Sequence, residues 1–180
     1  MCGIVGYVGA WNAAPVLLSG LSRLEYRGYD SAGIAVSDLR DGENRIEILK
    51  AKGRLQALKE MTDNGKAVSG TCGIGHTRWA THGEPSVANA HPHCSKDKRI
   101  VVVHNGIIEN YKELKEYLQK KGFVFLSETD TEVVAHLLDY YYKGNPLEAI
   151  ARALGRIRGS YALGILFKDQ PGKIYAVRKD

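Results

Sequence analysis

The 180-residue sequence has only three cysteines, no long apolar run and no recognisable export signal. An odd cysteine count without such a signal does not favour a disulfide framework. No segment approaches the roughly 18 apolar residues that a helix needs to cross a bilayer. The start of the chain lacks a basic region and contains Gly, Asn and Pro where a signal peptide is apolar. We therefore expect a cytoplasmic protein that does not enter the membrane.

Clustered positive charge is also missing. The 25 basic residues are interspersed with 20 acidic ones, which leaves a net charge of +5, and the longest basic run is Lys120-Lys121. A nucleic-acid-binding surface requires basic residues grouped with aromatics, so no nucleic-acid partner is expected. The excess positive charge is better explained by a solvated surface than by attraction of an anionic substrate.

The apolar content of 44% is enough for one domain over residues 1–180. Period-two and period-3.6 patterns predict the elements. Strands are expected at residues 4–8, 33–36, 45–50, 73–79, 100–104, 161–167 and 174–177, and helices at residues 16–24, 55–61, 111–121, 129–141 and 147–157. A run of strands followed by a run of helices favours a layered α+β domain over alternating βαβ units.

Two helix starts carry cap signals. Asn110 is placed to cap the helix that follows it, and Thr129 with Glu132 forms a capping-box pattern. The segment 79–98 has little apolar periodicity but contains three histidines. Long segments of this kind inside compact domains tend to be functional, so we expect site residues there.

Cys2 follows the initiator methionine directly. Aminopeptidases remove Met1 when the next residue is small, which would leave a thiol and a free α-amine on one residue. An α-amine has a pKa of about 7.7–8.0 and can act as general base for the thiol. The alternative is that Cys2 is an incidental small residue at a frayed end.

Three further positions suit attack on the side-chain amide of a free amino acid. Asn105-Gly106 follows an apolar strand and supplies two oxyanion donors, although this dipeptide is also a common hairpin turn. Arg78 offers a bidentate fork for an α-carboxylate and Asp130 a charge partner for an α-ammonium group. Taken singly, either of these two could instead be a surface ion or a helix cap.

Six motifs carry a family resemblance. They are Cys2-Gly-Ile-Val-Gly6, Leu24-Glu-Tyr-Arg-Gly-Tyr-Asp-Ser-Ala-Gly33, Gly75-His-Thr-Arg-Trp-Ala-Thr-His-Gly83, Ala90-His-Pro-His93, His104-Asn-Gly-Ile-Ile-Glu-Asn110 and Glu128-Thr-Asp-Thr-Glu132. In this order they resemble the glutaminase domain of glucosamine-6-phosphate synthases, which are N-terminal-nucleophile amidotransferases. Amidophosphoribosyltransferases typically have Arg-Gly-Gln in place of Arg27-Gly28-Tyr29, and Arg-Tyr-Ser-Thr in place of Arg78-Trp79-Ala80-Thr81.

The resemblance implies a role for each matched residue. Cys2 would attack glutamine, Asn105 and Gly106 would form the oxyanion hole, Arg27 would help to hold the N-terminus, Arg78 and Asp130 would bind the substrate carboxylate and ammonium, and Trp79, Thr81 and His82 would belong to a loop closing over glutamine. The family fold is a four-layer αββα sandwich. No metal or cofactor is implied.

The resemblance also sets expectations about the rest of such enzymes. In the family this domain continues past the position of Asp180, so the sandwich is expected to be truncated at its C-terminus. Two sugar-isomerase domains then follow, which bind fructose 6-phosphate and are absent from this sequence. The full-length enzymes are expected to be homo-oligomers, largely through those domains. L-Glutamine is therefore the one substrate expected to bind this chain directly.

Three competing interpretations remain. One is a zinc module built on His91, His93, Cys94 and either His104 or Cys72, but the spacing differs from paired zinc-ligand motifs. In that case Cys72 and Cys94 would be ligands instead of small buried residues. The second is an inactive glutaminase-like fold kept for binding. The third is the glutaminase part of another amidotransferase, such as one that feeds phosphoribosylamine synthesis.

Overall fold

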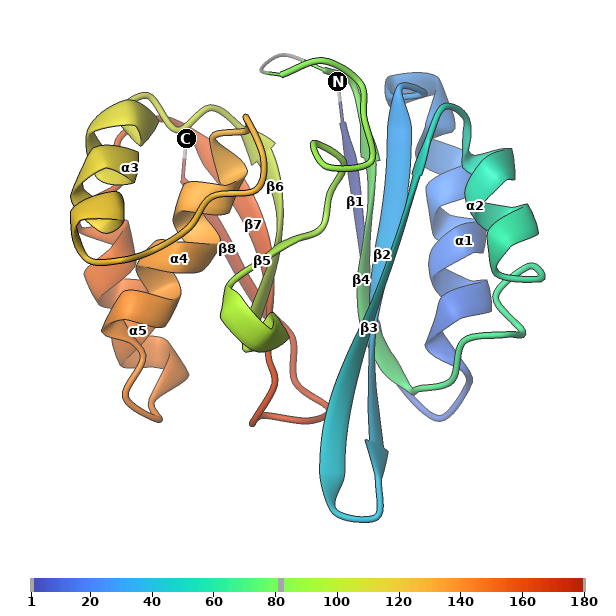
Figure 1. Cartoon of the computed structure of the whole chain (residues 1–180). Helices are drawn as coiled ribbons and strands as arrows, with labels where there is room; N and C mark the ends of the chain where they lie inside the picture. The colour runs from blue at the N-terminus through green and yellow to red at the C-terminus, as the bar shows by residue number, and fades with distance from the viewer. Residues whose placement is uncertain (1, 81–82, 180) are drawn as a thin grey trace.

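The computed structural model describes residues 2–80 and 83–179 and shows two antiparallel sheets lying face to face (Figure 1). The first sheet contains β1 (Gly3–Val8), β2 (Ser31–Arg40), β3 (Glu43–Lys52) and β4 (Cys72–Arg78), in the order β1-β4-β2-β3. The second contains β5 (His93–Cys94), β6 (Ile100–Gly106), β7 (Tyr161–Phe167) and β8 (Tyr175–Lys179), in the order β5-β6-β7-β8.

Helices cover the two outer faces. α1 (Ala13–Leu24) and α2 (Leu55–Met61) pack on the first sheet, and α3 (Tyr111–Lys120), α4 (Thr131–Tyr141) and α5 (Pro146–Leu154) cover the second (Figure 1). The arrangement is the four-layer αββα sandwich of the N-terminal-nucleophile hydrolases, which confirms the predicted fold class.

Strand β6 shows why the sequence gives this layering. Its residues Ile100, Val101, Val102 and Val103 are all fully buried. Because successive strand side chains point to opposite faces, Val101 and Val103 join the core between the sheets, while Ile100 and Val102 join the core beneath the helices. A continuous apolar run is what a strand buried on both faces requires.

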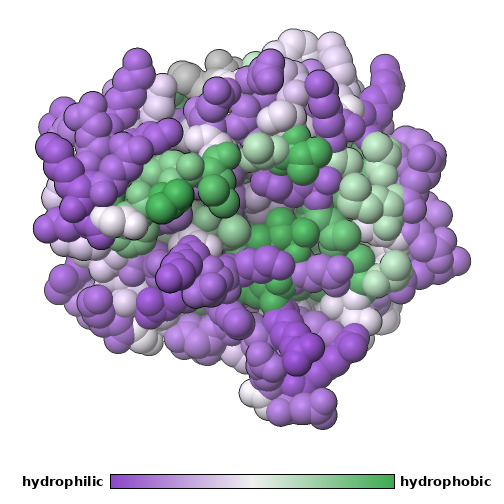
Figure 2. Space-filling model, viewed as in Figure 1, coloured by the Kyte–Doolittle hydropathy of each residue, from purple (hydrophilic) through white to green (hydrophobic). Residues whose placement is uncertain are grey.

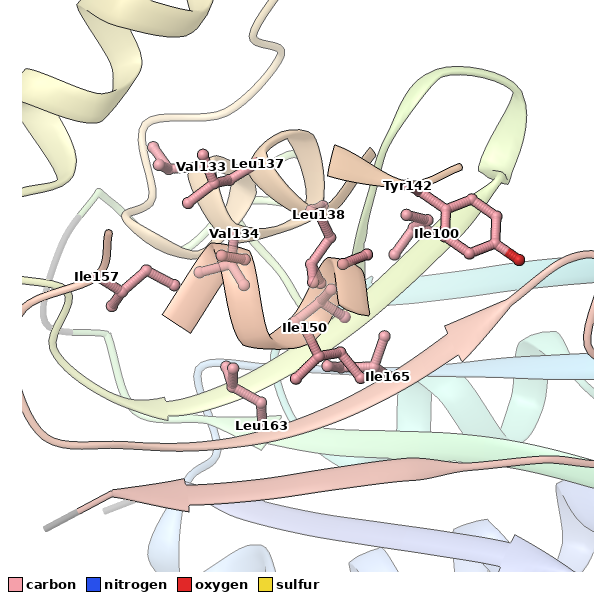
Figure 3. Packing of buried hydrophobic residues seen from close by; sticks show 14 of the residues in the cluster. Ile100, Val133, Val134, Leu137, Leu138, Tyr142, Ile150, Ile157, Leu163 and Ile165 are labelled. Atoms are coloured by element: carbon pink, nitrogen blue, oxygen red, sulfur yellow. The ribbon is translucent and has the colours of Figure 1, made fainter. Parts of the chain in front are cut away.

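The helical cores use the predicted periodic faces. Val134 and Leu138 of α4 meet Ile150 of α5 over Ile100 and Ile165 of the second sheet (Figure 3). On the opposite side, Leu17 and Leu21 of α1 and Leu58 of α2 pack against β2. The β2 residues in this core are Ile34 and Val36. Burial of such a side chain contributes about 1.5–3 kcal/mol.

Both predicted side-chain caps are wrong. Asn110 immediately precedes α3, but its side chain bonds the backbone of Arg156 and Arg158 instead of its own helix. Glu132 does not form a capping box with Thr129, because its carboxylate binds the preceding loop. Asn110 therefore has long-range partners and Glu132 has partners in the adjacent loop, and the packing of these segments decides both contacts.

Several element boundaries also differ from the predictions. β2 extends to Arg40, well past residue 36, because it pairs along its whole length with β3. The segment 79–98 contains the short strand β5 and a 3-10 turn at Lys96–Lys98, neither of which was predicted. α5 ends at Leu154, although Ile157 is buried in the same core.

Hydrophobic residues gather in the middle of the face seen in Figure 2, and hydrophilic residues surround them. Val124 and Leu126 are among the exposed large hydrophobic residues of the chain.

None of the helices within residues 2–80 and 83–179 combines the length and the apolar character needed to cross a bilayer.

Candidate active site

A cavity of about 360 Å³ lies between the sheets, where β1 begins and β4 and β6 end. The antiparallel register places Gly3 opposite Thr77, so the residue before β1 meets the residues after β4. Seven of the nine predicted site residues line this cavity: Cys2, Arg27, Arg78, Trp79, Asn105, Gly106 and Asp130. Residues about 130 positions apart in the sequence therefore share one site.

The sulfur of Cys2 sits against the backbone of Trp79. The Trp79 N–H donates to the Cys2 Sγ at 3.2 Å, and the Trp79 carbonyl lies 3.5 Å from the same sulfur. This backbone in turn packs so tightly on Gly28 that a Cβ there would lie 2.7 Å from the Arg78 carbonyl carbon. The backbone at the end of β4 thus contacts both Gly28 and the sulfur of Cys2, and no sequence pattern indicated these contacts.

Asn105 lies beside Cys2 on the facing sheet. Its Nδ2 donates to the Cys2 carbonyl at 3.2 Å, and its Oδ1 lies 2.9 Å from the Nε2 of His76. A carboxamide nitrogen carries two hydrogens, so a second N–H remains for a ligand oxygen. The side chain has the orientation that an oxyanion donor next to Cys2 requires.

Gly106 continues the same strand with φ of +118°. A Cβ at this position would lie 2.2 Å from the carbonyl oxygen of Ser160, so only glycine fits. The Asn-Gly pair does not form a two-residue hairpin turn, because Gly106 pairs with Tyr161 in β7. The alternative interpretation of this dipeptide is therefore wrong.

Arg78 ends β4 and is only 4% exposed. Its guanidinium donates to the carbonyls of Gly83 at 3.0 Å and Glu84 at 3.4 Å while lining the cavity. Burial lowers the pKa of Arg78, and the nearby Asp30 and Asp130 act in the opposite direction. A guanidinium stays charged under such a shift, so the site presents a fixed cation.

Asp130 lies immediately before α4 and is 6% exposed. Its carboxylate does not cap the helix, because Oδ2 accepts the Ile108 N–H at 2.8 Å. That bond ties the start of α4 to the segment after Gly106. The Asp130 carboxylate is therefore held close to Asn105 and Gly106 through its hydrogen bond to Ile108, which follows them in the chain.

Of the four remaining predicted residues, two line the cavity and are partly exposed, and two lie outside the described residues. Trp79 is 45% exposed and stacks edge-to-face with Tyr29. Arg27 is half-buried, and its Nε donates to the Tyr26 hydroxyl at 3.0 Å. Thr81 and His82, predicted to close over glutamine, lie outside the described residues.

The sequence patterns gave no catalytic role to a cluster of four buried histidines, two of which, His91 and His104, line the cavity. The cluster consists of His76, His91, His93 and His104. Burial lowers the pKa of all four, to about 3 for His76 and His93. They are therefore neutral near pH 7. The motifs contain all four, but their joint burial depends on contacts between the two sheets.

The zinc interpretation gains no support from this cluster. Within the described ranges, no group of three or more His, Cys, Asp or Glu side chains is arranged to hold a metal ion. His91 uses Nδ1 to accept the His104 N–H. All three cysteines are free, and burial raises the pKa of both Cys72 and Cys94.

Comparison with known proteins identifies the family. Residues 76–180, more than half of the chain, match the family model described as a glutamine amidotransferase domain. The chain belongs to the glutamine amidotransferase domain family. Solved structures agree with this assignment: a glutamine phosphoribosylpyrophosphate amidotransferase from B. subtilis superposes with a TM-score of 0.79 at 28% identity, covering 93% of this chain and 35% of that one.

Curated relatives of this amidotransferase domain are more similar in sequence. The glutamine–fructose-6-phosphate aminotransferase (isomerizing) of Caldanaerobacter subterraneus subsp. tengcongensis is 61% identical over the whole chain, which spans 29% of the relative. The protein of the same name from Thermus thermophilus is 58% identical over 94% of the chain and 27% of the relative. The chain thus spans less than a third of these relatives.

Behind the site, a buried carboxylate organises the loop that leads to Asp130. Glu132 is 3% exposed and accepts hydrogen bonds from the N–H groups of Leu126 and Ser127, from the Ser127 hydroxyl and from His136. Burial by itself raises the Glu132 pKa, but these hydrogen bonds outweigh it and lower the pKa to about 2 from 4.5.

We expect Glu132→Gln to lower the free energy of unfolding by about 3 kcal/mol at pH 7. In the folded chain the Glu132 carboxylate stays ionised down to a pH of about 2, whereas in the unfolded chain it takes up a proton near pH 4.5. The stabilisation is therefore complete above pH 4.5 and disappears as the pH falls towards 2. Urea unfolding at pH 7 and at about pH 2.5 measures the difference.

Glu148→Gln is the matched control, because Glu148 is half exposed and pairs with Arg152 on the surface of α5. Its effect should stay below about 0.5 kcal/mol at either pH. An equal loss of stability for Glu132→Gln at both pH values would show that the ionised carboxylate is not the source of the stabilisation.

Proposed function

We propose that this chain hydrolyses L-glutamine to glutamate and ammonia with Cys2 as the nucleophile. The observation that carries the proposal is the convergence of Cys2, Asn105, Arg78 and Asp130 on one cavity. Arg78 and Asp130 offer opposite charges for the α-carboxylate and α-ammonium of a free amino acid. The side-chain amide is then left facing the sulfur and Asn105.

The reaction follows from these positions. After loss of Met1, the α-amine of Cys2 takes the thiol proton, directly or through a water, and Sγ attacks the side-chain amide carbon. The carbonyl π electrons move to oxygen, where Asn105 Nδ2–H and the Gly106 N–H stabilise the oxyanion. Collapse breaks the C–N bond, and the leaving nitrogen takes the proton from the α-ammonium as ammonia departs.

A thioester on Cys2 remains after this step. Water adds to its carbonyl carbon and gives one proton to the α-amine. The C–S bond then breaks, the sulfur recovers a proton, and glutamate leaves. Neither half of the reaction requires a cofactor, because the nucleophile, base and oxyanion donors all belong to the chain.

The use of the ammonia is also a proposal. Relatives up to 61% identical are named glutamine–fructose-6-phosphate aminotransferases, whereas the superposed phosphoribosylpyrophosphate enzyme is 28% identical. We infer that residues 1–180 form the glutaminase domain of such an enzyme, and that fructose 6-phosphate accepts the ammonia in sugar-isomerase domains outside this sequence. We expect the full-length protein to be a homo-oligomer.

The purified chain is expected to release glutamate and ammonia from glutamine at the same rate with and without a chelator. It should not convert fructose 6-phosphate to glucosamine 6-phosphate, because we assign that step to sugar-isomerase domains outside this sequence. Coupled glutamate and ammonia assays measure the first activity, and mass spectrometry of the sugar phosphate measures the second. Inhibition by the chelator would restore the metal-site interpretation, and amino-sugar formation would overturn the domain assignment.

A further inference from the structure

His76 lies on β4 and is completely buried behind Asn105. Its Nε2 points at two oxygens of the facing strand β6. The His104 carbonyl lies at 3.0 Å and the Asn105 Oδ1 at 2.9 Å. The Nε2 of His76, in the first sheet, therefore contacts both the His104 backbone and the Asn105 side chain of the second sheet.

The backbone contact decides the position of the ring proton. A main-chain carbonyl can only accept a hydrogen bond, so the His76 Nε2 carries the hydrogen. A neutral imidazole has one N–H, and burial lowers the His76 pKa to about 3, so the ring is neutral near pH 7. Its other nitrogen, Nδ1, is buried without a hydrogen-bond partner among the described residues.

The ring proton in turn decides the orientation of the Asn105 carboxamide. Because Nε2 donates, the Asn105 atom facing it is the oxygen, and Nδ2 must face Cys2. The 3.2 Å bond from Nδ2 to the Cys2 carbonyl agrees with this independently. The fixed His104 carbonyl thus sets the tautomer of the His76 ring, and that tautomer sets which end of the Asn105 amide faces Cys2.

The ring itself is held in place. It stacks on the His91 ring with centroids 4.0 Å apart and planes 12° apart. His91 is anchored by the His104 N–H, which donates to its Nδ1 at 3.3 Å. The stacked pair therefore leaves His76 little freedom to rotate away from Asn105.

Without this donor, only the 3.2 Å bond from Nδ2 to the Cys2 carbonyl distinguishes the two orientations of the carboxamide, because the terminal torsion of asparagine is broad and roughly two-fold. One orientation presents Nδ2–H to a developing oxyanion, and the other presents an oxygen that repels it. We propose that His76 is a positioning residue that holds the Asn105 carboxamide with its N–H towards the oxyanion. The inference rests on the proposed function and assigns His76 a part in the reaction through Asn105, without contact to the substrate.

The test compares two variants of the full chain. His76→Leu removes the donor with similar bulk, and His76→Gln restores an N–H near the position of Nε2. We expect His76→Leu to lower kcat about 10- to 100-fold with the KM for glutamine within about two-fold, which stays below the full loss of an oxyanion donor. His76→Gln should recover much of kcat.

A double-mutant cycle separates positioning from folding. Asn105→Ala should lower kcat by itself, and His76→Leu should cause no further loss in that background, because its target is gone. The rate at which iodoacetamide alkylates Cys2 should be the same in His76→Leu and wild type, since alkylation needs no oxyanion donor. Equal losses of kcat in both backgrounds, or wild-type kcat for His76→Leu, would overturn the proposal.

A readout without turnover completes the test. Nitrogen-15 NMR of the wild-type chain should show His76 as the Nε2–H tautomer, and the Asn105 side-chain amide signals should shift in His76→Leu. An Nδ1–H tautomer overturns the positioning role even if glutamine is hydrolysed. If the wild type fails to hydrolyse glutamine, the proposed function is wrong, and the tautomer and amide signals still decide whether His76 orients Asn105.

Discussion

Replacing Cys2 by alanine is expected to abolish glutamine hydrolysis, because the thiol is the proposed attacking group. The same variant should lose covalent labelling by a diazoketone analogue of glutamine, which in the wild type should add once, at Cys2. Glutamate release and intact-mass analysis measure the two effects. Labelling that persists in Cys2→Ala would place the nucleophile elsewhere.

The other cysteines are matched controls. Cys72 is 1% exposed in the core between the sheets, and Cys94 is half-buried in β5. Burial raises the pKa of both thiols, which makes them poor nucleophiles. Cys72→Ala and Cys94→Ala should change stability at most, with labelling and kcat as in the wild type.

Cys2 is also the source of the proposed base, and this can be tested with the thiol intact. A lysine inserted between Met1 and Cys2 keeps the chain from starting at Cys2. The Cys2 nitrogen then becomes a peptide amide without useful basicity, so activity should fall to background. The active wild type should have the mass of a chain that lacks Met1. Full activity of the extended chain would exclude the α-amine as the base.

Arg78→Lys is expected to raise the KM for glutamine about 10- to 100-fold, the range for losing a charge-assisted hydrogen bond. A lysine keeps the charge but cannot reproduce two parallel hydrogen bonds to a carboxylate. The buried guanidinium also holds the carbonyls of Gly83 and Glu84, so part of the loss will come from that loop. Steady-state kinetics over a wide glutamine range measures the effect.

Two further variants complete this experiment. Arg45→Lys is the matched control, because the Arg45 side chain is 75% exposed in a surface ion pair, and its kinetics should equal those of the wild type. Asp130→Asn keeps an oxygen for the Ile108 N–H while removing the charge, so it should raise KM without loosening the loop. If Arg78→Lys and Asp130→Asn both keep the wild-type KM, the anchoring roles are wrong.

Much of the fold could be predicted from local patterns. The strand at residues 161–167 and the helix at residues 55–61 have the predicted bounds, because each is a short, strongly patterned segment between clear breaks. The caps of α3 and α4 were mispredicted for the opposite reason. Asn110 bonds the backbone of Arg158, 48 residues further along the chain, and Glu132 bonds the backbone of the loop before its own helix. The position of both segments depends on packing, which the local cap patterns do not contain.

The sequence by itself determined a layered α+β domain and the residues that could do chemistry, because burial on one or two faces and the reactivity of a side chain are properties of single segments, and the motifs added the four-layer sandwich through the family resemblance. Only the tertiary structure decided how those residues meet. Pairing of β1 with β4 brings Cys2 to the backbone of Trp79, and stacking of the sheets brings His76 to Asn105. Such contacts join residues tens of positions apart, and their distances and donor directions follow from register and packing that no local pattern contains.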